Sequence, residues 1–152
     1  MIRAVSLAGL LTAITVLLPS ESFGQGRMNW RGGGGWGPDS SYNRMFDPTT
    51  VETIRGEVVR VDKVAPMKGM SYGVHLTLKT HAGMISVHVG PAWYLENQDV
   101  KISAKDQIEV TGSRITFQGK PAIIAQEIRK GNDTLKLRDA NGFPRWSGWQ
   151  RR

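Results

Sequence analysis

Two neighbouring segments of the chain alternate strictly between apolar and polar residues, and this pattern constrains the fold more than any other feature. YGVHLTLKT at residues 72–80 and MISVHVG at residues 84–90 both repeat with a period of two. Such a period places every second side chain on the same face of a β-strand. The three residues between the segments, HAG, predict a turn, so we expect an antiparallel hairpin.

The register of this hairpin follows from matching its two apolar faces. The expected pairs are Val74 with Val89, Leu76 with Val87 and Leu78 with Ile85. This register makes His75 and His88 cross-strand neighbours on the outer face, where we expect them to be exposed together with Lys79.

Three more segments have the composition of strands. Residues 50–64 are rich in β-branched side chains, and their apolar positions change parity at Gly56, which predicts a bulge or sharp coiling there. Residues 106–117 and 120–131 predict a second hairpin around the turn Gln118-Gly119.

Two shorter segments add to this pattern. GPAWYLENQ at residues 90–98 predicts a short helix that begins near Pro91, with Tyr94 and Leu95 facing inward. DTLKLRD at residues 133–139 predicts a short edge strand. Five strands, with the first able to bend between two sheets and one short helix after the third, indicate an all-β, OB-fold-like Greek-key barrel. Another small β-barrel or an open meander would have the same number of strands.

The ends of the chain differ from this middle part. Residues 1–3 carry a positive charge and residues 4–18 are apolar, as in a secretory signal peptide, and we expect cleavage after Gly24. The alternative is an uncleaved anchor. After cleavage we expect no transmembrane span and a periplasmic or secreted protein.

The chain contains no cysteine. This excludes thiol catalysis, cysteine-ligated zinc, iron–sulfur clusters and covalent haem attachment. An exported small domain without disulfides has to fold on its hydrophobic core alone.

Several long stretches resemble a group of small exported bacterial OB-fold proteins. They are KGMSYGVHLTLKT, GPAWYLENQ, IEVTGSRITFQGKPAIIAQEI and LRDANGFPRWSGW, and the resemblance covers about residues 46–149. The resemblance implies the fold and export. Such proteins are often labelled nucleic-acid-binding or DNA-binding by analogy of fold, and the resemblance supplies no catalytic motif.

Two catalytic patterns are matched in letters only. Residues 69–73 read G-x-S-x-G, but a nucleophile elbow needs a strand before Ser71 and a helix after it, and here a loop precedes and a strand follows. GSRITFQGK at residues 112–120 departs from a phosphate-binding loop in its spacing and in Pro121. We therefore expect a protein that is not an enzyme and needs no cofactor.

The two neighbouring histidines suggest an alternative function. His75 and His88, with Met67, Met70 and His81 near the same end of the hairpin, offer imidazole and thioether ligands that suit copper. The opposing interpretation is that the histidines are solvated and that the methionines fill the core.

The net charge of +7 is concentrated at the ends, because residues 25–45 and 140–152 together carry more of the excess than residues 46–139. Both ends interleave cations with large rings. A single-stranded nucleic acid rewards this mixture by phosphate neutralisation and base stacking. With the outer face of the hairpin, the expected ligand-binding residues are Trp30, Arg31, Trp36, His75, Lys79, His88, Arg145, Trp146, Trp149, Arg151 and Arg152.

The structural alternative is that Trp146 and Trp149 pack on the barrel, or dock a protein partner of the cell envelope. The expected organisation is a signal peptide at 1–24, a flexible arm at 25–45, a barrel at 46–139 and a basic aromatic tail at 140–152. The expected function is an exported binding module for an anionic ligand, which is single-stranded nucleic acid or another polyanion.

Overall fold

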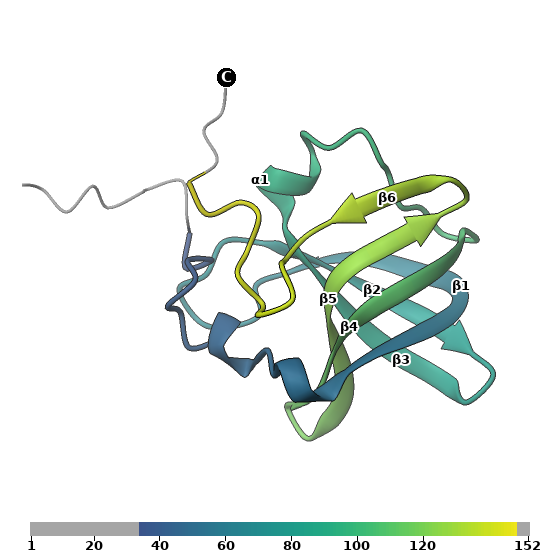
Figure 1. The fold of residues 1–152 in the computed structure, drawn as a ribbon, viewed down its shortest axis with the longest axis horizontal. Helices are drawn as coiled ribbons and strands as arrows, with labels where there is room; N and C mark the ends of the chain where they lie inside the picture. The colour runs from purple at the N-terminus through teal and green to yellow at the C-terminus, as the bar shows by residue number, and fades with distance from the viewer. Residues whose placement is uncertain (1–33, 149–152) are drawn as a thin grey trace, which may run out of the picture. The chain divides into compact units, whose positions relative to one another are not determined.

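Antiparallel pairs of strands form the barrel, and one parallel pair closes it (Figure 1). The computed structural model describes residues 34–148. Its sheet has the order β3-β2-β1-β4-β5-β6, and β3 also pairs with β5. The elements are β1 (Val51–Val64), β2 (Gly73–Thr80), β3 (Gly83–Pro91), α1 (Ala92–Leu95), β4 (Gln107–Phe117), β5 (Lys120–Lys130) and β6 (Asp133–Lys136). This is the closed OB-fold barrel that the sequence predicts, with β6 as its added edge strand.

The long first strand belongs to both sides of the barrel. Residues 51–57 of β1 pair with β4, and residues 57–64 pair with β2. A side chain at Gly56 would collide with the carbonyl oxygen of Lys79, so the glycine lets the two strands cross closely. The sharp coiling predicted for β1 is confirmed, but the register shift lies between Val58 and Arg60 instead of at Gly56.

The hairpin of β2 and β3 has the predicted register over most of its length. His75 pairs with His88, Leu76 with Val87 and Leu78 with Ile85. The predicted pairing of Val74 with Val89 is wrong, because the register shifts between Val74 and His75, so that Val74 pairs with Gly90. The extra residue in β3 at this point is a bulge, which period-two matching does not anticipate.

The remaining connections agree with the local turn chemistry. Gln118 and Gly119 both have positive φ, 51° and 78°, as a two-residue hairpin turn between β4 and β5 requires. Helix α1 begins directly after Pro91 and contains the buried Tyr94. Among the described residues, none belongs to a helix long and apolar enough to cross a membrane.

The core of the barrel consists of the inward-facing aliphatic side chains of all strands. Its fully buried members include Val58, Leu76, Leu78, Val87, Val110, Ile123 and Ile128. Four aromatic side chains from outside the strands join the same cluster: Tyr94 of α1, and Trp36, Tyr42 and Trp146 from the segments before β1 and after β6. The described part of the chain therefore buries aromatic residues that the sequence assigns to its ends.

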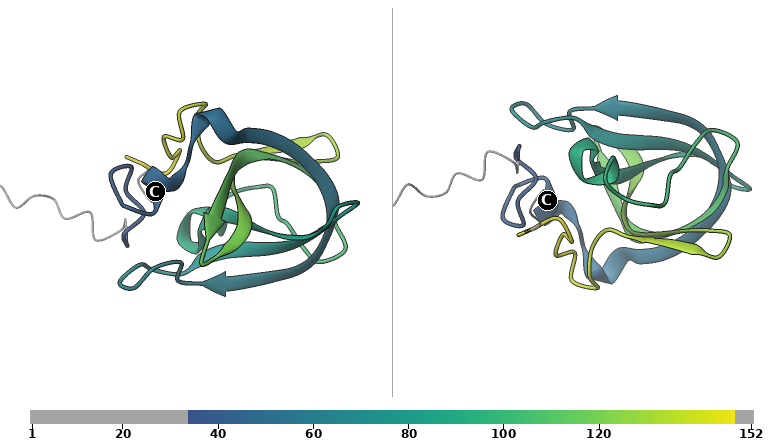
Figure 2. Two further views of the ribbon diagram at one scale, coloured as in Figure 1. Left: turned by 90° about the horizontal axis from the view of Figure 1, so that it is seen from below. Right: turned by 90° about the horizontal axis from the view of Figure 1, so that it is seen from above.

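Two segments outside the barrel strands lie side by side against it: residues 34–50 and residues 137–148 (Figures 1 and 2). Short 3₁₀ turns at Asn43–Met45 and Pro48–Thr50 shape the first segment. In their described parts, both segments pack on the barrel, because Trp36, Tyr42 and Trp146 are buried. The predicted signal peptide at 1–24 lies outside the described residues.

A candidate ligand-binding face on strands β2 and β3

Alternation along β2 and β3 defines the outer face of the barrel at this hairpin. Leu76, Leu78 and Val87 point into the core, so the residues between them point outward. OB-folds bind oligonucleotides and oligosaccharides on the face of their second and third strands. We call this surface the β2–β3 face; its outward residues are Gly73, His75, Thr77 and Lys79 from β2 and Met84, Ser86 and His88 from β3.

The two histidines of this face are stacked on each other. Their ring centroids are 3.8 Å apart and their planes differ by 5°. The hydroxyl group of Tyr42 is hydrogen-bonded to Nδ1 of His88 at 2.8 Å, and the ring of Phe117 meets His88 edge-on at 4.8 Å. The predicted adjacency of His75 and His88 is confirmed, whereas their predicted exposure is wrong, because Tyr42 and Phe117 cover the face: His88 is 1% exposed and His75 9%.

Burial keeps both imidazoles neutral. Loss of solvation lowers the pKa of His75 to about 4, although Asp62 opposes this shift. The pKa of His88 falls to about 3, mainly through burial. Repulsion from a protonated His75 and from the positive charge of Arg138 lowers this pKa further. Burial also raises the pKa of Tyr42, so its hydroxyl stays protonated.

The copper constellation suggested by the sequence is not assembled. Within residues 34–148, no three His, Cys, Asp or Glu side chains come close enough together to hold a metal ion. His75 and His88 are stacked in nearly parallel planes, so their ring nitrogens do not converge on one point. Met67 and Met70 pack against the hydrophobic core, and His81 is exposed in the β2–β3 turn.

Trp36 and Trp146 pack against two glycines within the strands, Gly73 of β2 and Gly90 of β3. A side chain at Gly73 would collide with Trp36, and one at Gly90 would come within 3.0 Å of Trp146. Each indole N–H donates a hydrogen bond to a carbonyl: Trp36 to Ser71 at 3.0 Å and Trp146 to Trp36 at 2.8 Å.

The structure therefore packs Trp146 on the barrel, which is the alternative that the sequence left open, and it also buries Trp36, which was expected to contact a ligand. Both rings are buried, Trp36 at 1% exposure and Trp146 at 3%, and they meet edge-on at 6.1 Å. Gly73 and Gly90 were the sequence signal for this packing, since a glycine within a strand leaves room for a large ring from another segment.

Arg138 is a buried cation that the sequence analysis does not single out. Its guanidinium donates to the carbonyl oxygens of Ala125 at 2.5 Å and Val89 at 3.3 Å, and lies 4.8 Å from the ring of Trp146. Burial lowers its pKa to about 10, which still leaves it charged at neutral pH. Arg138 thus fastens the segment after β6 across the line where β3 and β5 meet.

The other half of the β2–β3 face is open. Lys79 and Met84 are exposed and pair with each other across the hairpin, while Thr77 and Ser86 are half-buried. Strand β5 pairs with β3 over Ala122–Ile124 and Ser86–His88, and Lys120 is exposed at the start of β5.

The other predicted ligand residues divide into two groups. Arg145 is exposed on the described part of the tail. Trp30, Arg31, Trp149, Arg151 and Arg152 lie outside the described residues.

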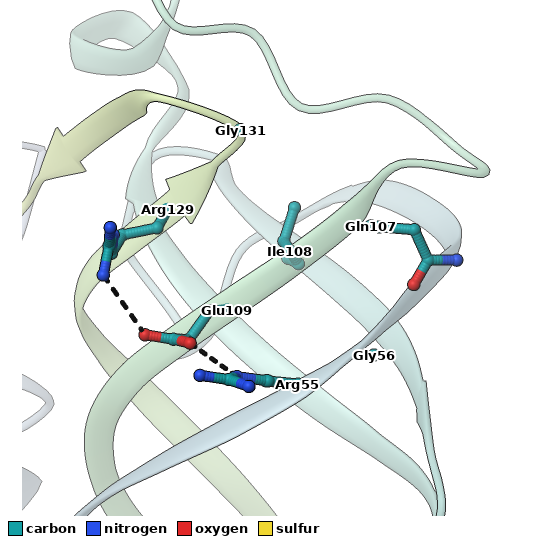
Figure 3. A pocket seen from close by; sticks show the side chains of 7 residues that line it. All are labelled: Arg55, Gly56, Gln107, Ile108, Glu109, Arg129 and Gly131. Atoms are coloured by element: carbon teal, nitrogen blue, oxygen red, sulfur yellow. Dashed lines mark hydrogen bonds and ion pairs between the residues drawn. The ribbon is translucent and has the colours of Figure 1, made fainter.

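A second polar surface lies where β4 runs between β1 and β5. A hollow of about 370 Å³ is lined by strands β1, β4 and β5 (Figure 3). In it, the carboxylate of Glu109 accepts from Nε of Arg55 at 2.6 Å and lies 3.8 Å from Nη1 of Arg129. The two arginines already share this carboxylate, so the hollow is an ion-pair network with one excess positive charge.

Ser71, the serine of the G-x-S-x-G pattern, lies in the loop before β2, and its Oγ has no hydrogen-bond partner among the described residues. The residues that the structure brings together on the β2–β3 face are suited to packing and to charge recognition.

Barrel closure and the single short helix define an OB-fold protein. Residues 50–135 match the MamS/MamX magnetosome protein family, and because this is more than half of the chain, the protein belongs to that family. No curated protein matches the chain.

Two solved structures are similar to this chain in fold. One is the Stn1-Ten1 complex of S. pombe, at 17% identity and a TM-score of 0.43, covering 64% of this chain and 79% of that one. The other is the N-terminal domain of PriB from Thermoanaerobacter tencongensis, a dimeric structure, at 10% identity and a TM-score of 0.40, covering 56% and 99%. At these identities the likeness concerns the fold alone.

Proposed function

We propose that this chain is an exported, non-enzymatic OB-fold module of the magnetosome system that binds an anionic polymer on the open half of the β2–β3 face. Membership of the MamS/MamX family supports the association with the magnetosome. The charged, apolar start of the sequence supports export. The observation that carries the ligand class is the exposed Lys79 beside the exposed Met84, with a second exposed lysine, Lys120, at the start of β5, the strand that pairs with β3.

The division of the face favours recognition by charge over recognition by stacking. Trp36 and Trp146 are both buried under neighbouring segments. In the described part of the chain, the large exposed aromatic side chains are Tyr72 and Phe143, and neither lies on β2 or β3. Sequence-tolerant binding of single strands relies on aromatic platforms, which this half of the face lacks.

The charge of the open half is moderate. Glu57 of β1 stands opposite Lys79 of β2 in the backbone register. The carboxylate of Glu57 accepts a hydrogen bond from the side-chain amide of Gln107 at 3.2 Å. Lys120 is exposed at the start of β5. A weak, salt-dependent interaction with phosphate or carboxylate groups follows from two cations and one nearby anion.

The test measures the binding of two polyanions to the wild type, to a double lysine variant and to a control variant. The full chain is titrated with a fluorescently labelled single-stranded oligonucleotide and with dextran sulfate, each at several salt concentrations. The double variant Lys79→Ala with Lys120→Ala is expected to weaken binding of both and to lower the salt slope for the oligonucleotide by about two. The matched control is Lys136→Ala, an exposed lysine on β6.

Three outcomes are informative. Equal losses for both polymers in the double variant, with an unchanged control, support recognition by charge. A loss confined to the oligonucleotide would assign the face to nucleic acid instead. Unaltered affinity in the double variant would overturn the proposed surface.

A further inference from the structure

The C-terminal half of β1 has an edge that no other described strand covers. Residues 59–64, which we call the β1 edge, pair with β2 on one side. On the other side, the last backbone partners belong to Val58, whose N–H donates to Asp106 at 2.8 Å and whose carbonyl accepts from Lys105 at 2.7 Å. Beyond Val58, no backbone hydrogen bond from residues 34–148 reaches this side of the strand.

The register shift after Val58 decides which backbone groups face outward. In an antiparallel strand, outward-directed N–H and C=O groups belong to alternate residues. Those of Val58 point away from β2. One inserted residue at Val59 moves the next outward positions to Val61 and Lys63. The N–H and C=O groups of Val61 are therefore available to another strand.

The side chains of the β1 edge are unusually apolar for an uncovered strand. Val59, Val61 and Val64 are 43%, 38% and 40% exposed. Uncovered edges with β-branched residues are templates for pairing with another chain, and charged residues and bulges normally limit this. The β1 edge has both protective features, so the arrangement of its charges determines which partner it accepts.

These charges are complementary to a second copy of the same strand. Arg60 and Asp62 lie on one face of β1, with Nε and Oδ2 2.7 Å apart. When two copies pair antiparallel with Val61 opposite Val61, each Arg60 stands opposite the second copy's Asp62. Centring the pairing on Arg60 or Asp62 would instead place two like charges opposite each other, which is unfavourable.

We propose that two copies of this chain associate through the β1 edge, antiparallel, with Val61 on the two-fold axis. The two Val61 residues exchange backbone hydrogen bonds, and Arg60 and Asp62 from both copies form a network of four alternating charges. In the view from above, the arrow-headed half of β1 lies at the rim of the barrel (Figure 2, right). Since the shared strand is short, the dimer is weak and depends on concentration and salt.

The test uses two variants that are each self-repulsive and mutually complementary. Arg60→Asp gives a chain with two acidic residues at positions 60 and 62, and Asp62→Arg gives a chain with two basic ones. Sedimentation equilibrium of the full chain is expected to show a wild-type dimer and, for each variant alone, dimerisation weakened by about tenfold or more. An equimolar mixture of the two variants is expected to restore association to near the wild-type level.

The mixture excludes effects within one chain, because neither variant can form the Arg60–Asp62 pair internally. Thermal unfolding of each variant shows that it is folded, and Lys136→Asp and Asp133→Arg on β6 are the charge-matched controls. A wild-type chain that is monomeric at all concentrations would overturn the proposal. So would variants that dimerise as the wild type does, or a mixture that remains monomeric.

Discussion

The two halves of the β2–β3 face differ in what lies above them, although both belong to the same two strands. One half holds the stacked His75 and His88 beneath Tyr42 and Phe117. The other half exposes Lys79 and Met84. The strands alone do not determine which half can bind a ligand, because segments from outside the barrel have already covered one of them.

The covering segments are held by complementary shapes and by buried polar contacts. Trp36 and Trp146 occupy the space above Gly73 and Gly90, and Arg138 bonds to carbonyls of β3 and β5. These contacts stabilise the fold, whereas the lysines of the open half contribute little to it. Substitutions in the two halves should therefore separate stability from binding.

The largest expected loss of stability follows removal of a covering ring. Trp146→Ala deletes a buried indole, and such substitutions cost about 3–5 kcal/mol. Chemical denaturation measures the change in the free energy of unfolding. Phe143→Ala is the control, because that ring is half exposed on the same segment and its loss should cost under about 1 kcal/mol. Equal losses for both variants would show that Trp146 does not cover the barrel.

The second largest expected effect is a loss of folding stability in acid, caused by the buried pair His75 and His88. The pKa values of His75 and His88 are lowered to about 4 and about 3, so below pH 6.5 the unfolded chain binds protons that the folded chain does not. Stability is thus fully present above about pH 6.5 and falls towards pH 4, by at most about 1.4 kcal/mol per pH unit for each histidine.

Denaturation between pH 7 and pH 4 measures this loss. His88→Gln should flatten the dependence on pH, and His81→Gln, which removes an exposed histidine from the turn, is the control. A profile of the wild type that is flat down to pH 4 would contradict the burial of the histidine pair.

A smaller effect is expected from the hydroxyl group of Tyr42. Tyr42→Phe keeps the ring but removes the partner of Nδ1 of His88, and an unsatisfied buried group costs about 1–3 kcal/mol. The double variant Tyr42→Phe with His88→Leu tests whether the cost comes from this hydrogen bond. If the two changes are simply additive, the bond does not link the two side chains energetically.

The smallest effect on stability belongs to the open half. Lys79→Ala removes an exposed side chain, and the free energy of unfolding should change by less than about 0.5 kcal/mol. Its affinity for dextran sulfate should nevertheless fall. A variant that loses stability without losing affinity would reverse the comparison between the two halves.

Local pattern in the sequence was sufficient to predict the barrel. Alternation in β2 and β3 gave the pairing of His75 with His88, and Gln118-Gly119 gave the turn between β4 and β5. The bulge that pairs Val74 with Gly90 was missed, because one inserted residue leaves no mark in a period-two pattern.

The covering of the face was not predictable by the same reasoning. The segment that contains Trp36 and Tyr42 has no hydrophobic period and is rich in glycine, which is typical of a linker. Arg138 lies in a segment with the pattern of an edge strand, where a charged side chain is expected in solvent. Both are buried by contacts between residues far apart in the sequence, which local patterns do not specify.

Hydrogen exchange of the tryptophan indole groups tests most directly whether the chain itself covers half of the face. The N–H groups of Trp36 and Trp146 are measured by NMR in the full chain, with and without oligonucleotide, and assigned with Trp36→Phe and Trp146→Phe. Because both donate to buried carbonyls, they should exchange slowly and remain unchanged when ligand is added. Exchange as fast as that of a free indole, or new signals on addition of oligonucleotide, would show that the tryptophans are open to ligand and contradict this account.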